Sequence, residues 1–180
     1  MEVKIPDLYL QLFRVKNDVT KYPNAVLRTV ASPVDDIASV QKLITRMSNI
    51  VRATGGVGLA APQAGESKRV IIVRRDNRYV LINPVIEECS GTYIADEGCL
   101  STPGLWGQVE RHQHIVLRGT TPHGKESVLR LSDMEAVVPQ HEIDHLDGIM
   151  FFDRAISDSL HWFSPTVGKQ ILAELQDSES

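Results

Sequence analysis

The chain has 180 residues, of which 42% are hydrophobic and 23% charged, and this composition suits one globular domain with a stable core. Its formal net charge of −4 provides no basic surplus, so we do not expect it to bind DNA. No run approaches the roughly 18 consecutive apolar residues of a membrane span, which excludes an integral helical membrane protein.

The amino-terminal region, residues 1–21, is predicted to be an extension ahead of the main pattern. It places Glu2 and Asp7 among basic residues and lacks the apolar centre and cleavage site of a signal peptide. The chain has only two cysteines, Cys89 and Cys99, which are too few for a disulfide framework. We therefore expect a cytoplasmic location.

The next segment predicts an amphipathic helix. Apolar residues recur at steps of three and four from Ile37 to Val51, which places them on one helical face. Asp35 or Asp36 is positioned to cap the start of this helix, and Gly55-Gly56 is expected to end it.

Four short β-branched runs follow and predict strands. Residues 69–75 and 78–84 are separated by an Asp-Asn turn signal, and residues 114–119 and 127–131 repeat the pattern around a second turn. Short strands with one helix before them and one after predict an α+β fold. We assign residues 1–180 to a single domain.

The carboxy-terminal part, residues 155–180, begins with a break in the pattern. After it, residues 166–176 predict a last helix, for which the sequence suggests no function.

The segment before that region contains a five-residue pattern, His141-Glu142-Ile143-Asp144-His145, of the form HExxH. On a helix, positions i and i+4 differ by about 40° around the axis, so both imidazoles face one side and can share a metal ion. Glu142 is then next to a metal ligand, where it can reach a metal-bound water. A solvated helix face that carries two histidines by chance is the alternative, and the pattern alone does not decide.

A third ligand is needed, and the sequence offers several candidates. One metalloprotease class requires a further histidine where this chain has Phe151, which excludes that class. Glu174 is a downstream carboxylate, but it lies beyond the break on the last predicted helix. Cys99 is a better candidate because a thiolate is a strong ligand for zinc or ferrous iron. Alternatively, Cys99 is a small, buried apolar residue without a chemical role. For Cys89, this is the interpretation that we expect.

Residues 55–65 form a small, apolar, glycine-rich segment. Its glycines would let the backbone pass close to a ligand, and the Gln63 amide is able to donate to an oxygen atom. The segment lacks the lysine of a phosphate-binding loop and the glycine spacing of a dinucleotide site. A tight helix-to-strand connection is the alternative interpretation.

Taken together, the three segments resemble the peptide deformylase family, whose motifs are GxGxAAxQ, EGCxS and HExDH in this order. They occur here at residues 56–63, 97–101 and 141–145, and the resemblance extends from about residue 21 to about residue 154. It implies antiparallel or mixed β-sheets packed around a central helix that carries HExxH, with further helices near each end.

The resemblance also implies a function, namely hydrolysis of the N-formyl group of formylmethionine on newly made polypeptides, which releases formate. The polypeptides would be met near the ribosome exit. One divalent metal ion, natively Fe²⁺ with Zn²⁺, Ni²⁺ or Co²⁺ able to replace it, would be bound by Cys99, His141 and His145.

The same resemblance assigns roles to the remaining motif residues. Glu142 would be the general base, while Gln63 and the Leu100 backbone N–H would stabilise the oxyanion together with the metal. The expected substrate-binding residues are Val57, Gly58, Glu97, Val137 and Val138. Among these, Gly58 would run beside the peptide as an added strand. For each valine, an ordinary core position is nearly as good an interpretation.

Three residues depart from the expected pattern. Trp106 occupies a position where many relatives carry a basic residue, which leaves the preference beyond methionine open, and Glu110 replaces a usual proline. Pro139 would be inside the helix if the helix begins at a capping box over residues 132–135, and in the first turn if it begins later.

Two other classes of function stay open at this level. A zinc endopeptidase would use HExxH, and a formyl-peptide-binding module would keep the site without the chemistry. The oligomeric state does not follow from the sequence.

Overall fold

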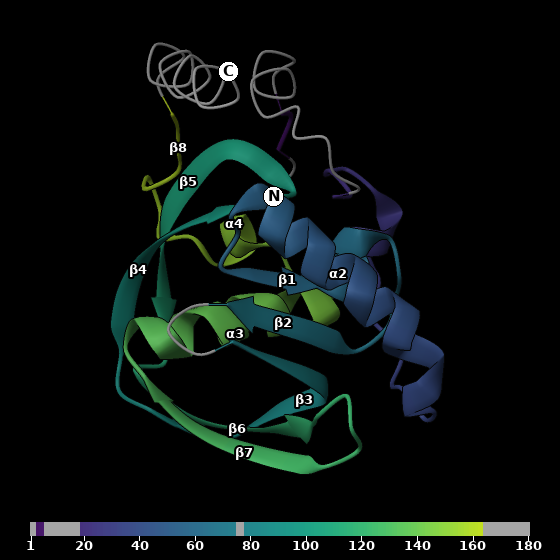
Figure 1. Cartoon of the computed structure of the whole chain (residues 1–180). Coiled ribbons are helices and arrows are strands. Elements are labelled where there is room, and N and C mark those ends of the chain that lie inside the picture. The colour runs from purple at the N-terminus through teal and green to yellow at the C-terminus, as the bar shows by residue number, and fades with distance from the viewer. Residues whose placement is uncertain (1–2, 6–18, 75–77, 164–180) are drawn as a thin grey trace, which may run out of the picture.

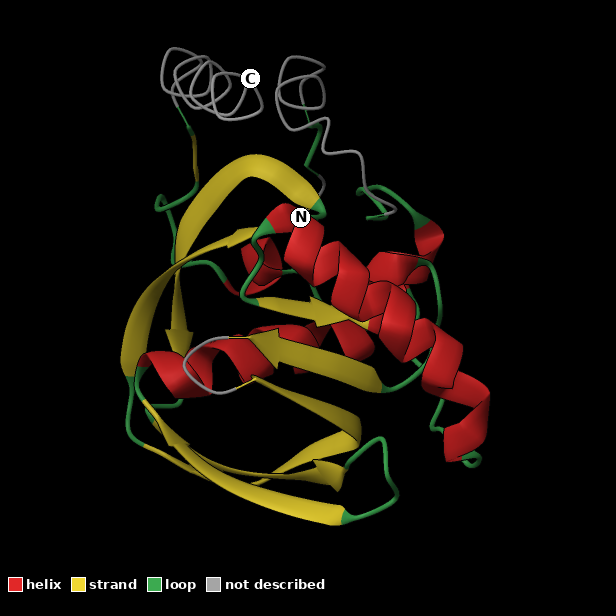
Figure 2. Cartoon of the chain, viewed as in Figure 1, coloured by secondary structure: helices red, strands yellow, loops and turns green. Residues whose placement is uncertain are grey.

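Two antiparallel sheets and two long helices make up most of the computed structural model, which describes residues 3–5, 19–74 and 78–163 (Figures 1 and 2). In chain order the helices and strands, with η marking 3₁₀ turns, are η1 (Ala25–Arg28), η2 (Ile37–Val40), α2 (Gln41–Thr54), β1 (Gly58–Ala60), η3 (Ala61–Ala64), β2 (Val70–Arg74), β3 (Arg78–Ser90), β4 (Tyr93–Cys99), β5 (Thr102–Arg111), β6 (His114–Thr120), β7 (Glu126–Ser132), α3 (Met134–Leu146), α4 (Phe151–Arg154) and β8 (His161–Trp162).

The predicted first helix is confirmed, but it begins as a 3₁₀ turn. The Asp36 side chain accepts a hydrogen bond from the Ala38 backbone N–H at 2.9 Å, which caps η2 before α2 continues. Gly55 ends α2 in the left-handed conformation, with φ of 65°. The apolar face of α2, from Leu43 to Val51, is buried as the three-and-four spacing predicts.

The larger sheet has the strand order β1-β2-β3-β6-β7, and every pairing in it is antiparallel. Both faces of its centre are buried. On β2, Val70 and Ile72 pack in the cluster that contains α2, whereas Ile71 and Val73 pack in the cluster that contains α3. Figure 2 shows the same arrangement, with α2 on the outer side of β1 and β2 and α3 near the centre of the molecule.

The four predicted strands correspond to β2, β3, β6 and β7, and β3 is longer than predicted. The sequence suggests an end at Pro84 because proline lacks the N–H that a central strand needs. The strand instead continues to Ser90, and its register against β6 shifts between Ile82 and Val85, so Pro84 lies in that irregular step.

The smaller sheet, in the order β4-β5-β8, is not evident from the sequence. Its strands contain Gly98, Pro103, Gly104 and Gly107, which break the apolar alternation that normally indicates a strand. A third core cluster forms between this sheet and α4, where Phe151 is almost fully buried.

The metal-motif helix α3 runs from Met134 to Leu146, so Pro139 is inside it. The predicted capping box does not form, because the residue before the helix is Asp133 and its side chain makes no capping bond. One turn of α3 is fixed through Gln140 to the connection between β5 and β6. Its amide Oε1 accepts from the His112 backbone N–H at 3.0 Å, and its Nε2 donates to the His112 carbonyl at 2.9 Å.

The α+β class predicted from the sequence is therefore confirmed. The predicted last helix at 166–176 and most of the amino-terminal extension lie outside the described residues. Within the described ranges, no helix is both long enough and apolar enough to cross a bilayer.

The end of α2 provides a stability test, because Gly55 adopts positive φ and an added Cβ would meet no atom within 4 Å. Gly55→Ala therefore carries a conformational cost without a clash, and we expect a loss of about 1 kcal/mol. Thermal unfolding should show a Tm lower by about 2–4 °C. Gly55→Asn is the control and should lose less, since asparagine tolerates this conformation. Equal Tm values for all three proteins would contradict this account.

Candidate metal centre

Three side chains with metal-ligand chemistry converge where β4 ends beside α3. Cys99 is the last residue of β4, while His141 and His145 are one helical turn apart on α3. Their ligand atoms all lie within 4.8 Å of one another, and Cys99 Sγ is 3.2 Å from His145 Nε2. The spacing that the sequence suggests thus brings one sulfur and two imidazoles together, and we call this set the metal trio.

Glu97 orients one member of the trio. Its Oε2 is 2.7 Å from His141 Nδ1, which leaves the other ring nitrogen, Nε2, to face the trio. Arg111 donates to both carboxylate oxygens of Glu97, at 2.7 and 2.9 Å. Both oxygens of Glu97 are therefore engaged, and its side chain positions His141. The substrate-binding role expected for Glu97 from the sequence stays a prediction.

The same arginine reaches the helix directly. Arg111 also pairs with Asp144, the residue just before His145, and Asp144 in turn accepts two hydrogen bonds from Arg154 of α4. Glu97, Arg111 and Asp144 are 5%, 5% and 6% exposed. Buried charges persist only where they are mutually paired, so this network fixes α3 against β4, β5 and α4.

Charge attraction lowers the pKa values of Cys99 and Glu97. Burial alone would raise the pKa of the Cys99 thiol, but the nearby His145 charge and hydrogen bonds to both histidines lower it well below the usual range. Burial alone would also raise the pKa of Glu97. The hydrogen bonds from Arg111 and His141 outweigh this effect and lower the pKa to about 2. The environment therefore favours a thiolate at Cys99, the form that binds metals.

Glu142 lies beside the trio in a confined space. It is 4% exposed, and its Oε2 has no hydrogen-bond partner among the described residues. Burial is the largest influence on its pKa, which is raised to about 7. A Cβ atom added at Gly58 would lie 2.2 Å from Glu142 Oε1, so the carboxylate occupies the space that a side chain at Gly58 would take.

Gln63 reaches the trio from η3. Its Oε1 accepts from the Ala60 backbone N–H at 2.8 Å, which fixes the amide orientation. Its Nε2 then points toward Cys99 Sγ and Ser101 Oγ, each at 3.4 Å. A donor held in this way is suited to an oxygen atom of a bound ligand.

A cavity of about 640 Å³ contains this chemistry. Every site residue suggested by the sequence lines it except His145, which is 1% exposed and lies behind the others. The predicted residues that do line it are Val57, Gly58, Gln63, Glu97, Cys99, Leu100, Val137, Val138, His141 and Glu142.

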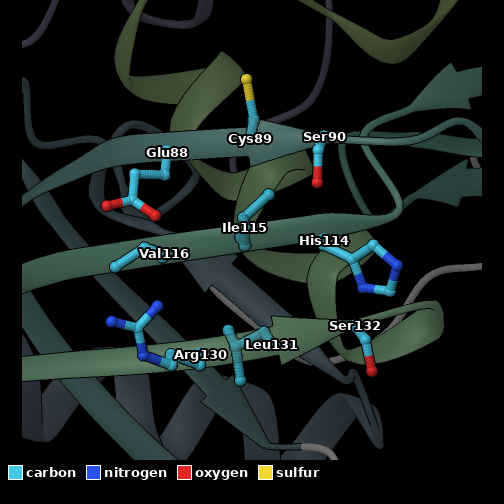
Figure 3. Close-up of a pocket in the computed structure, with 9 residues that line it drawn as sticks. All are labelled: Glu88, Cys89, Ser90, His114, Ile115, Val116, Arg130, Leu131 and Ser132. Atoms are coloured by element: carbon cyan, nitrogen blue, oxygen red, sulfur yellow. The ribbon is translucent and has the colours of Figure 1, made fainter.

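A second, smaller cavity of about 460 Å³ lies on β3, β6 and β7 and, in the described part of the chain, shares no lining residue with the first (Figure 3). Cys89 lines it and is exposed, so the expectation of a buried Cys89 is wrong. Figure 3 shows the Cys89 side chain on the opposite side of β3 from Glu88 and Ser90. Cys89 takes no part in the metal trio.

Lys21 is a site residue that the sequence does not indicate, since a single lysine in an extension carries no recognisable pattern. Its Nζ donates to the Leu100 carbonyl at 3.0 Å, and it lines the larger cavity. The neighbouring backbone N–H groups of Thr20 and Tyr22 donate to the carbonyls of Gln63 and Ser101. This short segment thus connects the two loops that supply Gln63 and Leu100.

The arrangement defines a class of protein. A thiolate and two imidazoles, with a buried carboxylate and an amide donor in one cavity, form the ligand set and acid–base group of a metal-dependent hydrolase.

Comparison with known proteins identifies the family within that class. The family model described as polypeptide deformylase matches residues 16–160. A peptide deformylase of Desulforudis audaxviator is 47% identical over 141 residues, covering 76% of this chain and 92% of that protein. One from Syntrophomonas wolfei is 44% identical over 140 residues, covering 77% and 92%. The chain belongs to the polypeptide deformylase family, and it is an enzyme of the hydrolase class.

Solved structures agree with this assignment. A peptide deformylase from Synechococcus elongatus in complex with actinonin superposes with a TM-score of 0.76 at 33% identity, covering 80% of this chain and 81% of that one. The peptide deformylase of Thermus thermophilus gives a TM-score of 0.74 at 37% identity, covering 91% and 94%.

Gly58 allows a test of the site geometry. Gly58→Ala would place a methyl group 2.2 Å from Glu142 Oε1 and 2.9 Å from Val138 Cγ1, so the carboxylate must move. A shift of about 1 Å in a catalytic group costs roughly 100-fold in rate, and we expect a loss of kcat/KM of that order. Gly56→Ala is the control and should lose less activity, because its added Cβ would lie 3.1 Å from the nearest side-chain atoms. Full activity of Gly58→Ala would show that the rate does not depend on this position of Glu142.

Proposed function

We propose that this chain removes the formyl group from the amino-terminal formylmethionine of newly synthesised polypeptides, using one divalent metal ion bound by Cys99, His141 and His145. The convergence of these three residues, two of which line one cavity together with Glu142 and Gln63, is the observation that supports the proposal most strongly. Fe²⁺ is proposed as the native metal, with Zn²⁺, Ni²⁺ and Co²⁺ able to replace it, because one sulfur and two nitrogen ligands suit these borderline and soft ions.

The residues present fit such an ion. The thiol of Cys99 is held toward its anionic form, and Glu97 occupies the outer nitrogen of His141, an arrangement common around metal-bound histidines. When bound, the metal would polarise the formyl oxygen and make a water molecule more acidic.

Glu142 would act as the general base and then as the general acid. Its carboxylate takes a proton from the attacking water, and it gives that proton to the amine nitrogen as the bond between the formyl carbon and nitrogen breaks. Formate and a free amino terminus are the products. The unpartnered Oε2 supports this role, because no described residue competes for the proton, and the absence of a side chain at Gly58 leaves room for the carboxylate at the cavity wall.

Gln63 and Leu100 would stabilise the negative charge that develops on the formyl oxygen. The Gln63 Nε2 makes two long contacts of 3.4 Å, so it can donate a stronger hydrogen bond to a bound oxygen. The Leu100 backbone N–H would be the second donor, and the Lys21 bond to the Leu100 carbonyl holds that loop in place.

The peptide would bind as an added strand. β1 lies at one end of the larger sheet and β4 at one end of the smaller sheet, and both contribute residues to the cavity. An extended peptide between them would pass Gly58 on one side and Gly98 on the other. Val57, Val137 and Val138 would surround the methionine side chain; Val137 and Val138 are buried, while Val57 is 48% exposed.

A cytoplasmic location and action on polypeptides near the ribosome exit complete the proposal. Both are expected from the substrate, because formylmethionine is present where translation begins and would be processed as the chain emerges. We also propose that residues 1–180 form one domain.

The decisive experiment measures formate release from a formyl-Met-Ala-Ala peptide by protein purified without oxygen and loaded with Fe²⁺ or Ni²⁺. The acetylated peptide is the control, since a site built for a formamide should exclude the larger acyl group. Glu142→Gln should lower turnover at least about a hundredfold, and Gln63→Ala about 10²–10³-fold, both with one equivalent of metal retained.

The rival functions predict other results. Cleavage of internal peptide bonds would indicate an endopeptidase, and stable binding of an intact formyl peptide by the metal-loaded protein would indicate a binding module. Glu142→Gln with near-normal turnover would remove Glu142 from the mechanism.

Glu97 allows a test of the ligand assignment that does not depend on activity. Glu97→Ala removes the group that orients His141, and we expect metal affinity to fall about 10–100-fold, measured by competition with a chelator. Glu110→Ala is the matched control, because Glu110 is exposed and next to Arg111 on the same strand. Unchanged metal affinity in Glu97→Ala, with a melting curve that shows a folded protein, would contradict the role assigned to Glu97.

A further inference from the structure

Trp106 is placed against the cavity by the glycine opposite it. Trp106 on β5 pairs with Gly98 on β4, so both residues project to the same face of the smaller sheet. A Cβ at Gly98 would lie 2.6 Å from Trp106 Cε2 and 3.0 Å from Cδ2, which shows that the indole lies directly over the Gly98 backbone. The indole therefore covers β4, the end strand of this sheet, and it lines the cavity.

Phe163 supports the indole from the carboxy-terminal side. Its ring centroid is 5.2 Å from that of Trp106 at an interplanar angle of 80°, an edge-to-face geometry that aromatic pairs favour. The Phe163 backbone N–H donates to the Gly104 carbonyl at 2.9 Å, which fixes the ring next to β5. Both rings line the cavity, and we call the pair Trp106 and Phe163 the aromatic corner.

Most of the cavity wall next to the aromatic corner is apolar, with Leu100, Pro103 and Gly104 in the same lining. One carboxylate is present on this side, because Asp96 lies two residues before Gly98 on the same face of β4 and also lines the cavity. Aromatic and aliphatic surfaces of this kind favour an apolar group, because they offer a charged group no partner for its lost water.

The aromatic corner is also within reach of a bound substrate. Gly98 precedes Cys99, so the Cα atom that lies beneath the indole is about 3.8 Å from the Cα atom of a member of the metal trio. A peptide added beside β4 with its formyl group at the trio advances about 3.3 Å per residue, and its side chains alternate between the two faces. The side chain of either the second or the third residue therefore projects onto the face that carries the indole.

We propose that the aromatic corner selects substrates with a large apolar side chain, aromatic above all, at the second or third residue after the formyl group. This inference depends on the proposed function, because it assumes that a formyl peptide lies beside β4. It makes Trp106 a specificity-determining residue of this chain, distinct from the residues that carry out the hydrolysis.

The test compares two series of amidated peptides, formyl-Met-X-Ala and formyl-Met-Ala-X, in which X is Phe, Leu, Ala, Asp or Arg. Amidation removes the terminal charge, so only X varies. In one series kcat/KM should rank Phe above Leu, Ala and Asp, with Phe exceeding Ala about three- to tenfold, the range expected for an aromatic pair. In Trp106→Ala the ratio of Phe to Ala should fall to about one, while Trp106→Phe should keep most of it.

Ile94→Ala is the matched control. Ile94 is an exposed apolar residue of β4 that does not line the cavity, so its removal should change neither the ranking nor the rate. A ranking that survives in Trp106→Ala, or equal kcat/KM across both series, would overturn the proposal. Arg favoured over Phe would also overturn it, because the subsite would then bind cations on the indole face.

Failure of this proposal and failure of the proposed function give different results. Formate release from formyl-Met-Ala-Ala without any dependence on X rejects the aromatic corner alone. No formate release from any peptide by metal-loaded protein rejects both. Should Trp106→Ala fail to fold, the ratio of Phe to Ala measured in Phe163→Leu decides: it should fall, since this variant reduces the aromatic surface while keeping an apolar side chain, and an unchanged ratio would overturn the proposal.

Discussion

The site depends above all on the guanidinium of Arg111, which is buried between two carboxylates. It pairs with Glu97 of β4 and with Asp144 of α3, and all three groups are buried. An isolated charge at such depth costs several kcal/mol, so Arg111 depends on the two carboxylates and each carboxylate depends on a cationic partner. Since Glu97 also holds His141, and Asp144 immediately precedes His145, the positions of two members of the metal trio follow from where Arg111 lies. Apolar packing brings α3 against the larger sheet, and this ionic network sets its position relative to the smaller one.

Two glycines, Gly58 and Gly98, shape the cavity because they have no side chain. At Gly58 the absent Cβ leaves space for the Glu142 carboxylate, and at Gly98 it leaves space for the Trp106 indole. These two glycines belong to the end strands of different sheets, so neither strand carries a side chain of its own at these points of the channel where we propose the peptide binds. A β-sheet edge presents unpaired N–H and C=O groups, and glycine lets a peptide approach them closely. The same two positions thus serve both the catalytic residue and the substrate.

The sequence predicts the elements whose signal is local. The three-and-four spacing of α2 and the β-branched runs of β2, β6 and β7 depend on each segment alone, and each was correctly predicted. β4 and β5 escape prediction because glycines and Pro103 interrupt their alternation, and three of these residues, Gly98, Pro103 and Gly104, line the cavity. The partners of Glu97 are likewise tertiary: Arg111 is 14 residues away and Asp144 lies on another element, so no spacing rule connects them. The role of Lys21 cannot be predicted for the same reason, since Lys21 and its hydrogen-bond partner Leu100 are 79 residues apart in the sequence.

The motifs and the aromatic corner together suggest how this chain combines the proposed hydrolysis with a substrate preference of its own. The residues proposed for hydrolysis all lie within the three motifs, whereas Trp106 and Phe163 lie outside them. The two groups meet at Gly98, which belongs to the second motif, precedes Cys99, and lies beneath the indole. A larger side chain at Gly98 would displace either the indole or the β4 backbone next to Cys99. Position 106 is not constrained in this way, because its side chain extends over the glycine into the cavity and can change without moving a metal ligand. The fold therefore keeps the chemistry at rigid, buried positions and leaves the choice of peptide to a neighbouring residue of the cavity wall.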